Sequence, residues 1–369
     1  MYKGNRIEES MIVNTSERDF RRRREPATMW PMQTRLTDDE LAVQDAFRSF
    51  FANESSTAVV REAAAGLGHS PSVWDALSAM GGPGMALPSS LGGGDATLRD
   101  LGVVADVYGA HLAPVPFIEH TVAARLLAAA GGHDDLVGEL ATGSPLATVA
   151  LQPVTDGVAR FVPSGAVAEV VLARTDEGVV LGRSTPPGER LPNTGDLPIA
   201  HRELDGPVID VAASAWDHAL DEWRALTAVA YVGLGRRAIE MGVAYSRERV
   251  QFGAPIGTFQ ALQQGYADAA TRIEGAHLLA HRAVWALDTG QPNASRLAGM
   301  ALLFATEAAR FATDRSMQYH GGYGFSEEYD VQLYHRRATA WILQLGDPSL
   351  EYARLADAEF GPRTTGAAA

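Results

Sequence analysis

The chain has 369 residues, 46% of them hydrophobic and 21% charged, with a formal net charge of -14 and no cysteine. This size and composition allow two or three packed units and argue against disorder in most of the chain. The negative charge disfavours binding to nucleic acid or to an anionic membrane, and the lack of cysteine excludes disulfides and thiol catalysis. No apolar run approaches the roughly 20 residues that span a bilayer, and the N-terminus has no apolar signal-peptide core, so we expect a cytoplasmic protein.

The beginning of the chain carries charge without hydrophobic periodicity. Residues 1–35 are polar and include four consecutive arginines, Arg21–Arg24. Charge runs usually belong to disordered segments, so we expect a disordered tail, with an anion-binding arm as the other interpretation.

Helical patterns fill residues 36–143, which we interpret as an N-terminal helical domain. Thr37 followed by Glu40 predicts a capping box at the start of its first helix. The breaker-rich stretch "GGPGMALPSSLGGG" predicts a loop between later helices.

The pattern changes twice after residue 143. Residues 144–212 hold short β-rich runs such as "EVVLAR" and "GVVLG", which predict a small antiparallel sheet or barrel. Over residues 213–360 apolar residues recur at steps of three and four, most regularly from Phe259 to Leu287. This spacing predicts a four-helix bundle that also packs on copies of itself or on a partner. We expect residues 361–369 to form a tail.

A charged turn interrupts the first part of the bundle, in "YSRERVQFGAPIGTFQ" at residues 245–260. Arg249 is expected to end a helix, and Gly253 and Pro255 to force a turn. An arginine beside exposed backbone and an aromatic ring suits a pyrophosphate next to a flat base. The alternative is an arginine that caps the helix C-terminus and interacts with its dipole.

A glycine-rich turn interrupts the bundle again, in "QYHGGYGFSEEYDV" at residues 318–331. Gly321 and Gly322 would let a ligand approach the backbone, and Ser326 is expected to cap the helix that follows. The alternative for the glycine pair is a simple connection between two helices.

Together these two segments resemble motifs of the acyl-CoA dehydrogenase family. The stretches "MALPSSLGGG" and "LAPVPFIEH" are also similar to the family, particularly to its actinobacterial branch, and the resemblance covers residues 36–360. It implies a mainly α fold: an N-terminal helical domain, a small β-barrel-like middle domain and a C-terminal four-helix bundle. Members desaturate acyl-CoA thioesters: a carboxylate removes the α proton while FAD accepts the β hydride.

The resemblance also implies roles for particular residues. In the family, the arginine and glutamine of these motifs and the glycine pair hold the diphosphate and adenosine parts of an FAD that lies mainly in the neighbouring subunit. The residues implied to bind this shared FAD are Arg249, Gln251, Phe252, Gln318, Gly321 and Gly322. The segment "DEWR" implies substrate-binding roles for Asp221 and Arg224, with a surface ion pair as the alternative.

The sequence departs from the family where the chemistry takes place. Residues 144–212 lack the Thr/Ser-rich stretch and the tryptophan that cover the flavin ring in the family. Leu345 stands at the usual position of the catalytic glutamate, and Trp223 at the position that a minority of members use. Neither side chain can accept a proton.

Four nearby groups are conceivable replacement bases. Asp347 is better explained by turn and cap chemistry, and Glu222 is about 100° around the helix from Trp223. His320 and His335 are interpreted as structural residues or cofactor neighbours.

We therefore expect no catalytic residue and no metal site in this chain. The prediction is an oxidoreductase subunit of lipid metabolism, the non-catalytic partner in a hetero-oligomer, expected to be a tetramer. Expected partners are a paralogous acyl-CoA dehydrogenase subunit, an acyl-CoA substrate and an electron-transfer flavoprotein or similar acceptor. One alternative is a homo-oligomeric dehydrogenase with Glu222 or Asp347 as a relocated base. The other is a scaffold that lost its cofactor.

Overall fold

The computed structural model describes residues 35–183 and 188–361. Contacts group residues 34–369 into one compact unit, separate from residues 1–33. The predicted tail with Arg21–Arg24 and nearly all of the expected C-terminal tail lie outside the described residues. Within the described residues, no helix is long and apolar enough to cross a bilayer.

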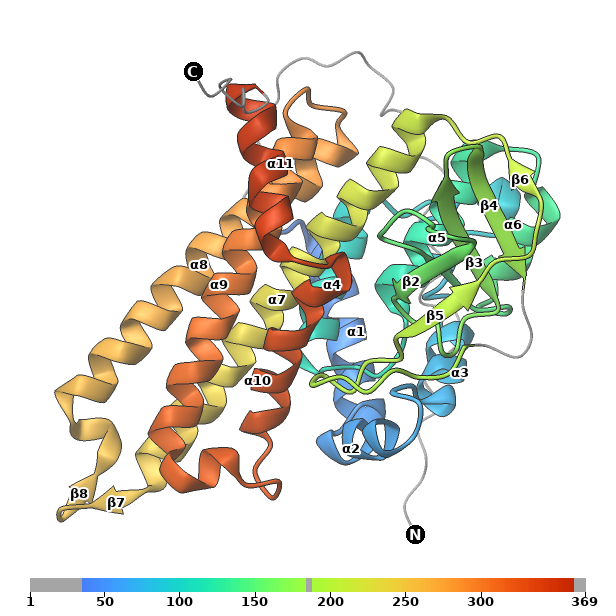
Figure 1. Cartoon of the computed structure of the whole chain (residues 1–369). Helices are drawn as coiled ribbons and strands as arrows, with labels where there is room; N and C mark the ends of the chain where they lie inside the picture. The colour runs from blue at the N-terminus through green and yellow to red at the C-terminus, as the bar shows by residue number, and fades with distance from the viewer. Residues whose placement is uncertain (1–34, 184–187, 362–369) are drawn as a thin grey trace, which may run out of the picture. The chain divides into compact units, whose positions relative to one another are not determined.

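Helices form the N-terminal part of the described chain (Figure 1). They are α1 (Asp38–Glu54), α2 (Thr57–Ala65), α3 (Pro71–Ala79), η2 (Ser89–Leu91), α4 (Leu98–Ala110), α5 (Phe117–Ala130) and α6 (Asp134–Ala141). The predicted capping box is confirmed, since the Glu40 N–H donates to the Thr37 hydroxyl at 3.2 Å and the Thr37 N–H donates to the Glu40 carboxylate at 2.7 Å. This exchange satisfies two backbone donors that a helix start leaves free.

Strands follow between the two helical parts. They are β1 (Ala147–Val149), β2 (Val158–Val162), β3 (Val170–Thr175), β4 (Gly178–Arg183), β5 (Ala200–Glu203) and β6 (Val208–Ile209). One sheet has the order β1-β3-β4-β6, and β2 pairs with β5 in a second. The expectation of a wholly antiparallel sheet is wrong, because β1 and β3 run parallel. The chain leaves β1 for the second sheet through β2 before it returns as β3, which is the long connection that parallel neighbours require.

Long helices form the C-terminal part. They are α7 (Ala213–Glu248), α8 (Gln260–Asp288), α9 (Ala294–His320), α10 (Val331–Ala340) and α11 (Pro348–Phe360), with the short elements β7 (Val250–Gln251), β8 (Ala254–Pro255), η3 (Ile256–Thr258), η4 (Gly321–Phe325) and η5 (Trp341–Leu345). In Figure 1, α7, α8 and α9 lie side by side with α10 next to them. The predicted fold class, mainly α with a small β domain and a C-terminal bundle, is confirmed. The domain boundaries remain a prediction.

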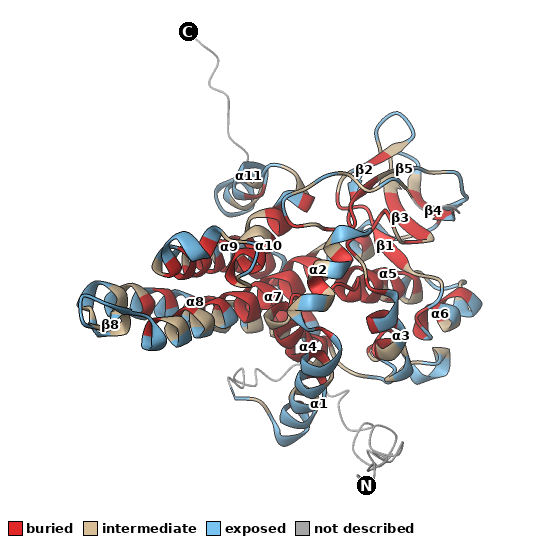
Figure 2. Ribbon diagram, turned by 90° about the horizontal axis from the view of Figure 1, so that it is seen from below, coloured by how far each residue is buried: buried red, intermediate tan, exposed pale blue. Residues whose placement is uncertain are grey.

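The alanine-rich stripe of α8 is buried against its neighbours in the bundle. Ala269, Ala276, Ala280 and Ala283 are all fully buried, and Figure 2 shows buried residues along the inner sides of α7, α8 and α9. Small side chains at these positions allow the helix axes to approach closely.

The helix expected to begin at Ser326 begins later, at Val331. The Ser326 hydroxyl accepts the N–H of Glu328 at 3.3 Å inside a turn and caps no α-helix. Asp330 precedes α10, and its carboxylate accepts the Thr57 hydroxyl at 3.0 Å and pairs with Arg61 at 2.9 Å. Contacts with α2 therefore hold the turn up to Asp330, which the local sequence does not reveal.

Two glycines permit a close crossing of α4 and α7. A Cβ atom on Gly109 of α4 would stand 1.9 Å from the Ala230 carbonyl oxygen of α7, and one on Gly233 would stand 1.9 Å from the Asp106 carbonyl oxygen. No side chain fits at either position without moving a helix backbone. The crossing fixes the separation of α4 and α7.

We expect Gly109→Ala to lower the free energy of unfolding by more than about 2 kcal/mol, because the added methyl group has no room. Gly138→Ala is the matched control: it lies within α6 and its Cβ would meet only one atom, at 3.9 Å. The control should stabilise the protein by about 0.5–1 kcal/mol, since alanine is the better helix former. Urea unfolding monitored by circular dichroism measures both. Equal effects of the two substitutions would refute the tight crossing.

Candidate functional site

A groove opens at the end of the bundle where α7 stops and α9 turns into η4. Its volume is about 790 Å³. Its walls come from the end of α7, the β7–β8 hairpin, the start of α8 and the Gly321–Phe325 turn. All six residues implied to bind FAD line this groove: Arg249, Gln251, Phe252, Gln318, Gly321 and Gly322. Two segments distant in sequence thus meet as one candidate cofactor site.

The glycine pair leaves its backbone open to the groove. Gly321 has φ 63°, and a Cβ atom on Gly321 or Gly322 would meet nothing within 4 Å. Gly324, three residues after Gly321, is different, because its Cβ would stand 2.4 Å from the Met317 carbonyl oxygen. Gly324 therefore serves internal packing, whereas Gly321 and Gly322 present bare backbone to a ligand.

Arg249 and Phe252 leave much of their side chains available to a ligand in the groove. Arg249 forms no ion pair with any described residue, and its guanidinium lies 5.6 Å from the centre of the Tyr323 ring. Phe252 has φ 52° and its side chain is 97% exposed. A fully exposed phenylalanine in a strained backbone conformation is unfavourable in water unless another surface covers it. The guanidinium of Arg249, the bare backbone at Gly321 and the exposed ring of Phe252 together fit a diphosphate that is attached to a flat base.

His320, which also lines this groove, is held by contacts within the protein. His320 stacks on Tyr245 with the ring centres 4.2 Å apart, and its Nδ1 lies 2.7 Å from the Ser316 carbonyl oxygen. Burial lowers the pKa of His320, with the hydrogen bond from its ring to Ser316 opposing. His335 pairs with Asp314 at 3.0 Å.

The two positions at which the resemblance implies a base carry packed apolar side chains. Trp223 is only 1% exposed, and half-buried Leu345 packs on the main core. The cavity beside Trp341 and Gln344, lined also by Glu119 and Arg337, has a volume of about 20 Å³. Such a space holds about one water molecule and no acyl group.

Glu119 is a buried carboxyl group that the sequence analysis missed. Burial raises its pKa, with its own backbone N–H, the Trp223 side chain and the Arg337 charge opposing. Arg337 is itself 6% exposed, and its Nε has no hydrogen-bond partner. No local pattern marks these two residues, since their burial arises from the packing of α5 and α10 around α7.

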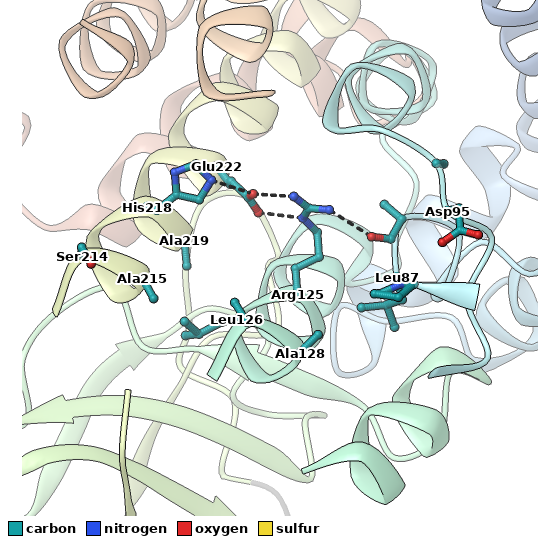
Figure 3. A pocket seen from close by; sticks show the side chains of 14 residues that line it. Leu87, Asp95, Arg125, Leu126, Ala128, Ser214, Ala215, His218, Ala219 and Glu222 are labelled. Carbon is teal, nitrogen blue, oxygen red and sulfur yellow. Dashed lines mark hydrogen bonds and ion pairs between the residues drawn. The ribbon is translucent and has the colours of Figure 1, made fainter. Parts of the chain in front are cut away.

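Glu222 points away from Trp223, as the helix geometry predicts, and lies in a different cavity. This cavity has a volume of about 670 Å³ and lies between α5, α7 and the loop that contains Ala86 and Asp95. Figure 3 shows Glu222 joined to both Arg125 and His218. Arg125 donates two hydrogen bonds to the carboxylate, at 2.7 and 3.0 Å, and His218 Nε2 lies 3.2 Å from it.

The charges around Glu222 make it a poor base. Burial alone would raise its pKa, but the hydrogen bond from His218 and the positive charge of Arg125 lower it to about 2. The hydrogen bond to Glu222 in turn raises the pKa of His218. A carboxylate that holds its negative charge so firmly gains little by accepting a proton.

Asp347 is the N-cap of α11, as the sequence predicts. It precedes α11, and its carboxylate accepts the Ser349 N–H at 2.8 Å. This hydrogen bond lowers the pKa of Asp347, whose side chain is exposed to solvent.

Asp221 and Arg224 form an ion pair at 2.8 Å, one helical turn apart. The alternative interpretation predicted an ion pair at the surface. The ion pair is present, but both residues are buried, so its predicted location is wrong. Arg224 also pairs with Glu351 of α11 at 3.1 Å, and Arg354 pairs with the same carboxylate at 2.6 Å. This network joins α7 to α11, and neither Asp221 nor Arg224 lines a cavity described above.

Two helical parts around a small sheet, with a groove suited to a dinucleotide, define the architecture of a flavin-dependent dehydrogenase. Models of the acyl-CoA dehydrogenase N-terminal and C-terminal domains match residues 37–135 and 214–346. "Acyl-CoA dehydrogenase IpdE2" of Mycolicibacterium smegmatis is 32% identical over 292 residues, 78% of this chain and 88% of the relative. Its namesake from Mycobacterium tuberculosis is 31% identical over 86% of this chain and 96% of the relative. This chain belongs to the acyl-CoA dehydrogenase family.

Solved structures agree with this assignment. A chain from a variant of the "Tcur3481-Tcur3483 steroid ACAD" has a TM-score of 0.80 and 28% identity, over 87% of this chain and 97% of that chain. A chain of the "ChsE4-ChsE5 complex from Mycobacterium tuberculosis" has a TM-score of 0.78 over 90% of this chain and 100% of that chain. At 24% identity, this second likeness shows the fold.

The low pKa of Glu222 predicts an acid-sensitive contribution to stability. Its folded pKa of about 2 lies below the ordinary value of 4.5, so the contribution is complete above about pH 4.5 and is lost as the pH falls towards 2. Between pH 6 and pH 3 the wild type should lose about 2 kcal/mol more stability than Glu222→Gln. Urea unfolding at both pH values measures this difference, with exposed Glu177→Gln as the control that behaves like the wild type. Parallel pH profiles for wild type and Glu222→Gln would contradict the low pKa.

Proposed function

We propose that this chain is the non-catalytic subunit of a hetero-oligomeric acyl-CoA dehydrogenase. Its role is to complete the binding site of an FAD that a paralogous subunit holds mainly. One observation carries the proposal: the six implied cofactor residues share one open groove, while Leu345 and Trp223 occupy the positions of the base.

Different residues of the groove would bind different parts of FAD. Arg249 and the backbone of Gly321 and Gly322 would hold the diphosphate, and Phe252 would hold the adenosine part. The bound FAD supplies the acceptor for the hydride. The exposure of Phe252 and the lack of an ion partner for Arg249 in the described residues support a contact that another subunit completes.

Names of similar proteins support the hetero-oligomer and the substrate class. Two of the similar structures carry names that pair two components, Tcur3481-Tcur3483 and ChsE4-ChsE5, and the first is called a steroid ACAD. We therefore propose a paralogous partner, a tetrameric assembly and a bulky, steroid-like acyl-CoA substrate. An electron-transfer flavoprotein or similar protein would reoxidise the flavin. Substrate contacts by Asp221 and Arg224 also remain a proposal, which their engagement by Glu351 weakens.

A homo-oligomeric dehydrogenase with its own base is the second candidate. Glu119 favours it, because it is a buried carboxyl group beside Trp223 with a raised pKa. The size of the neighbouring cavity, about 20 Å³, opposes it. Glu222 is held by Arg125, and Asp347 caps α11, so both are less suited to remove a proton than Glu119.

A scaffold without cofactor would have no need for an open groove. Nothing in the packing requires glycine at Gly322, where a side chain would meet no atom within 4 Å. Flavin content of the chain expressed with its paralogue, compared with the chain alone, distinguishes the scaffold from the proposed subunit.

We expect Arg249→Ala to weaken FAD binding by the assembly about tenfold or more, because a charge-assisted contact to phosphate contributes roughly 1.5–3 kcal/mol. Arg249→Lys should recover part of the affinity, since lysine keeps the charge but not the planar donor geometry. Arg247→Ala removes an exposed charge from the same helix end outside the groove and serves as the control. Fluorescence titration with FAD measures the affinities. An unchanged FAD affinity in Arg249→Ala would show that Arg249 does not bind the diphosphate.

Replacing each candidate base should leave catalysis nearly intact. We expect Glu119→Gln, Glu222→Gln and Asp347→Asn, made one at a time, to keep turnover of the FAD-loaded assembly within about threefold. The physical reason is that the partner supplies the carboxylate that removes the α proton. A fall of a hundredfold, about 2.7 kcal/mol of barrier, in any one variant with FAD bound would move the base into this chain and favour the homo-oligomer.

A further inference from the structure

Two histidines and an aspartate meet on the side of the bundle, away from the cavities described above. Asp106 lies on α4, and His277 and His281 lie on α8. One ligand atom from each residue lies within 4.8 Å of the other two. No metal site was predicted from the sequence, although the two histidines in "HLLAH" are four residues apart, which is a local signal.

Helix geometry brings the two imidazoles together. Residues four apart share one helix face, and the ring centres of His277 and His281 are 4.4 Å apart. Asp106 is 5% exposed and belongs to the stretch of α4 that Gly233 allows to approach α7 closely. Both histidines are half-buried, so a dissolved ion can reach the group from one side.

The donor atoms suit a borderline transition metal. His277 Nδ1 is buried and has no hydrogen-bond partner. Two imidazole nitrogens and one carboxylate oxygen form a donor set that Zn²⁺ accepts, with a water molecule as the fourth ligand. Ligand atoms of tetrahedral zinc lie about 3.4 Å apart, so modest side-chain rotations would close the observed spacing.

Arg236 competes for the same carboxylate. Its Nη1 lies 2.8 and 3.1 Å from the two oxygens of Asp106. The Arg236 side chain is 41% exposed and can therefore move into solvent. A metal ion would take at least one oxygen from Arg236, and the positive charge of the guanidinium would weaken its binding.

We propose that Asp106, His277 and His281 form a Zn²⁺ site that ties α4 to α8. The ion would link the N-terminal helices to the bundle across segments that are distant in sequence. It lies on neither the proposed FAD groove nor the packed base positions, so the proposal does not depend on the proposed function.

Calorimetric titration of the full, untagged and chelator-treated chain with Zn²⁺ tests the site. We expect one ion per chain in the wild type and at least tenfold weaker binding in His277→Gln and in His281→Gln. Arg236→Ala should bind more tightly than the wild type, because the competing cation is gone. His133→Ala, outside the cluster, is the control and should match the wild type. Circular dichroism confirms that each variant is folded.

Titration with Co²⁺ supplies an independent readout. The wild type should gain visible absorption bands of a tetrahedral or five-coordinate nitrogen and oxygen site, and the double variant His277→Gln/His281→Gln should not. Zn²⁺ uptake that is absent from the wild type, or that the double variant retains, would overturn the proposal. In the second case the ion binds elsewhere on the chain.

Discussion

The close crossing of α4 and α7 at Gly109 and Gly233 is the constraint on which the other features depend. Because backbone meets backbone there, α7 is fixed over its middle by direct contact rather than by side chains that could repack. Trp223, Glu222 and Arg249 all belong to this helix or its end, so their directions follow from its position and rotation. A shift of α7 would move the packed base positions and the groove together.

Buried charge around α7 adds a second kind of constraint. Glu222 is held by Arg125 and His218, and Arg224 by Asp221 and Glu351. Removing one partner of such a pair leaves an uncompensated buried charge, which costs more than the pair contributes. Each pair thus fixes the rotation of α7 against α5 on one side and α11 on the other. The same hydrogen bonds that hold Glu222 also keep its pKa low and its lone pairs engaged, so structural use and use as a base exclude each other there.

Features that depend on residues close together in the sequence could be predicted, whereas features that depend on tertiary contacts could not. The residues of the candidate cofactor groove could be named because two short segments resemble family motifs, each within a few residues. The direction of Glu222 followed from helix geometry alone. Glu119 could not be recognised, because its burial depends on three helices that meet only in the folded chain. The late start of α10 and the parallel pairing of β1 with β3 were missed for the same reason: contacts with α2, and the route through a second sheet, override the local pattern.

Distance along α7 separates the candidate cofactor groove from the packed side chain of Trp223. Trp223 lies inside α7, ten residues after its first residue, and Arg249 caps the C-terminal end of the helix. The two are separated by 26 residues, roughly 39 Å at 1.5 Å per residue. The groove at the far end is open, and its arginine and glycines face solvent or a partner, so their usefulness does not depend on the core. The positions where the resemblance implies a base lie in the core, where Trp223 and Leu345 gain stability from packing. A substitution at position 223 that leaves the helix in place therefore does not reach the groove, which makes the proposed cofactor-binding subunit physically consistent.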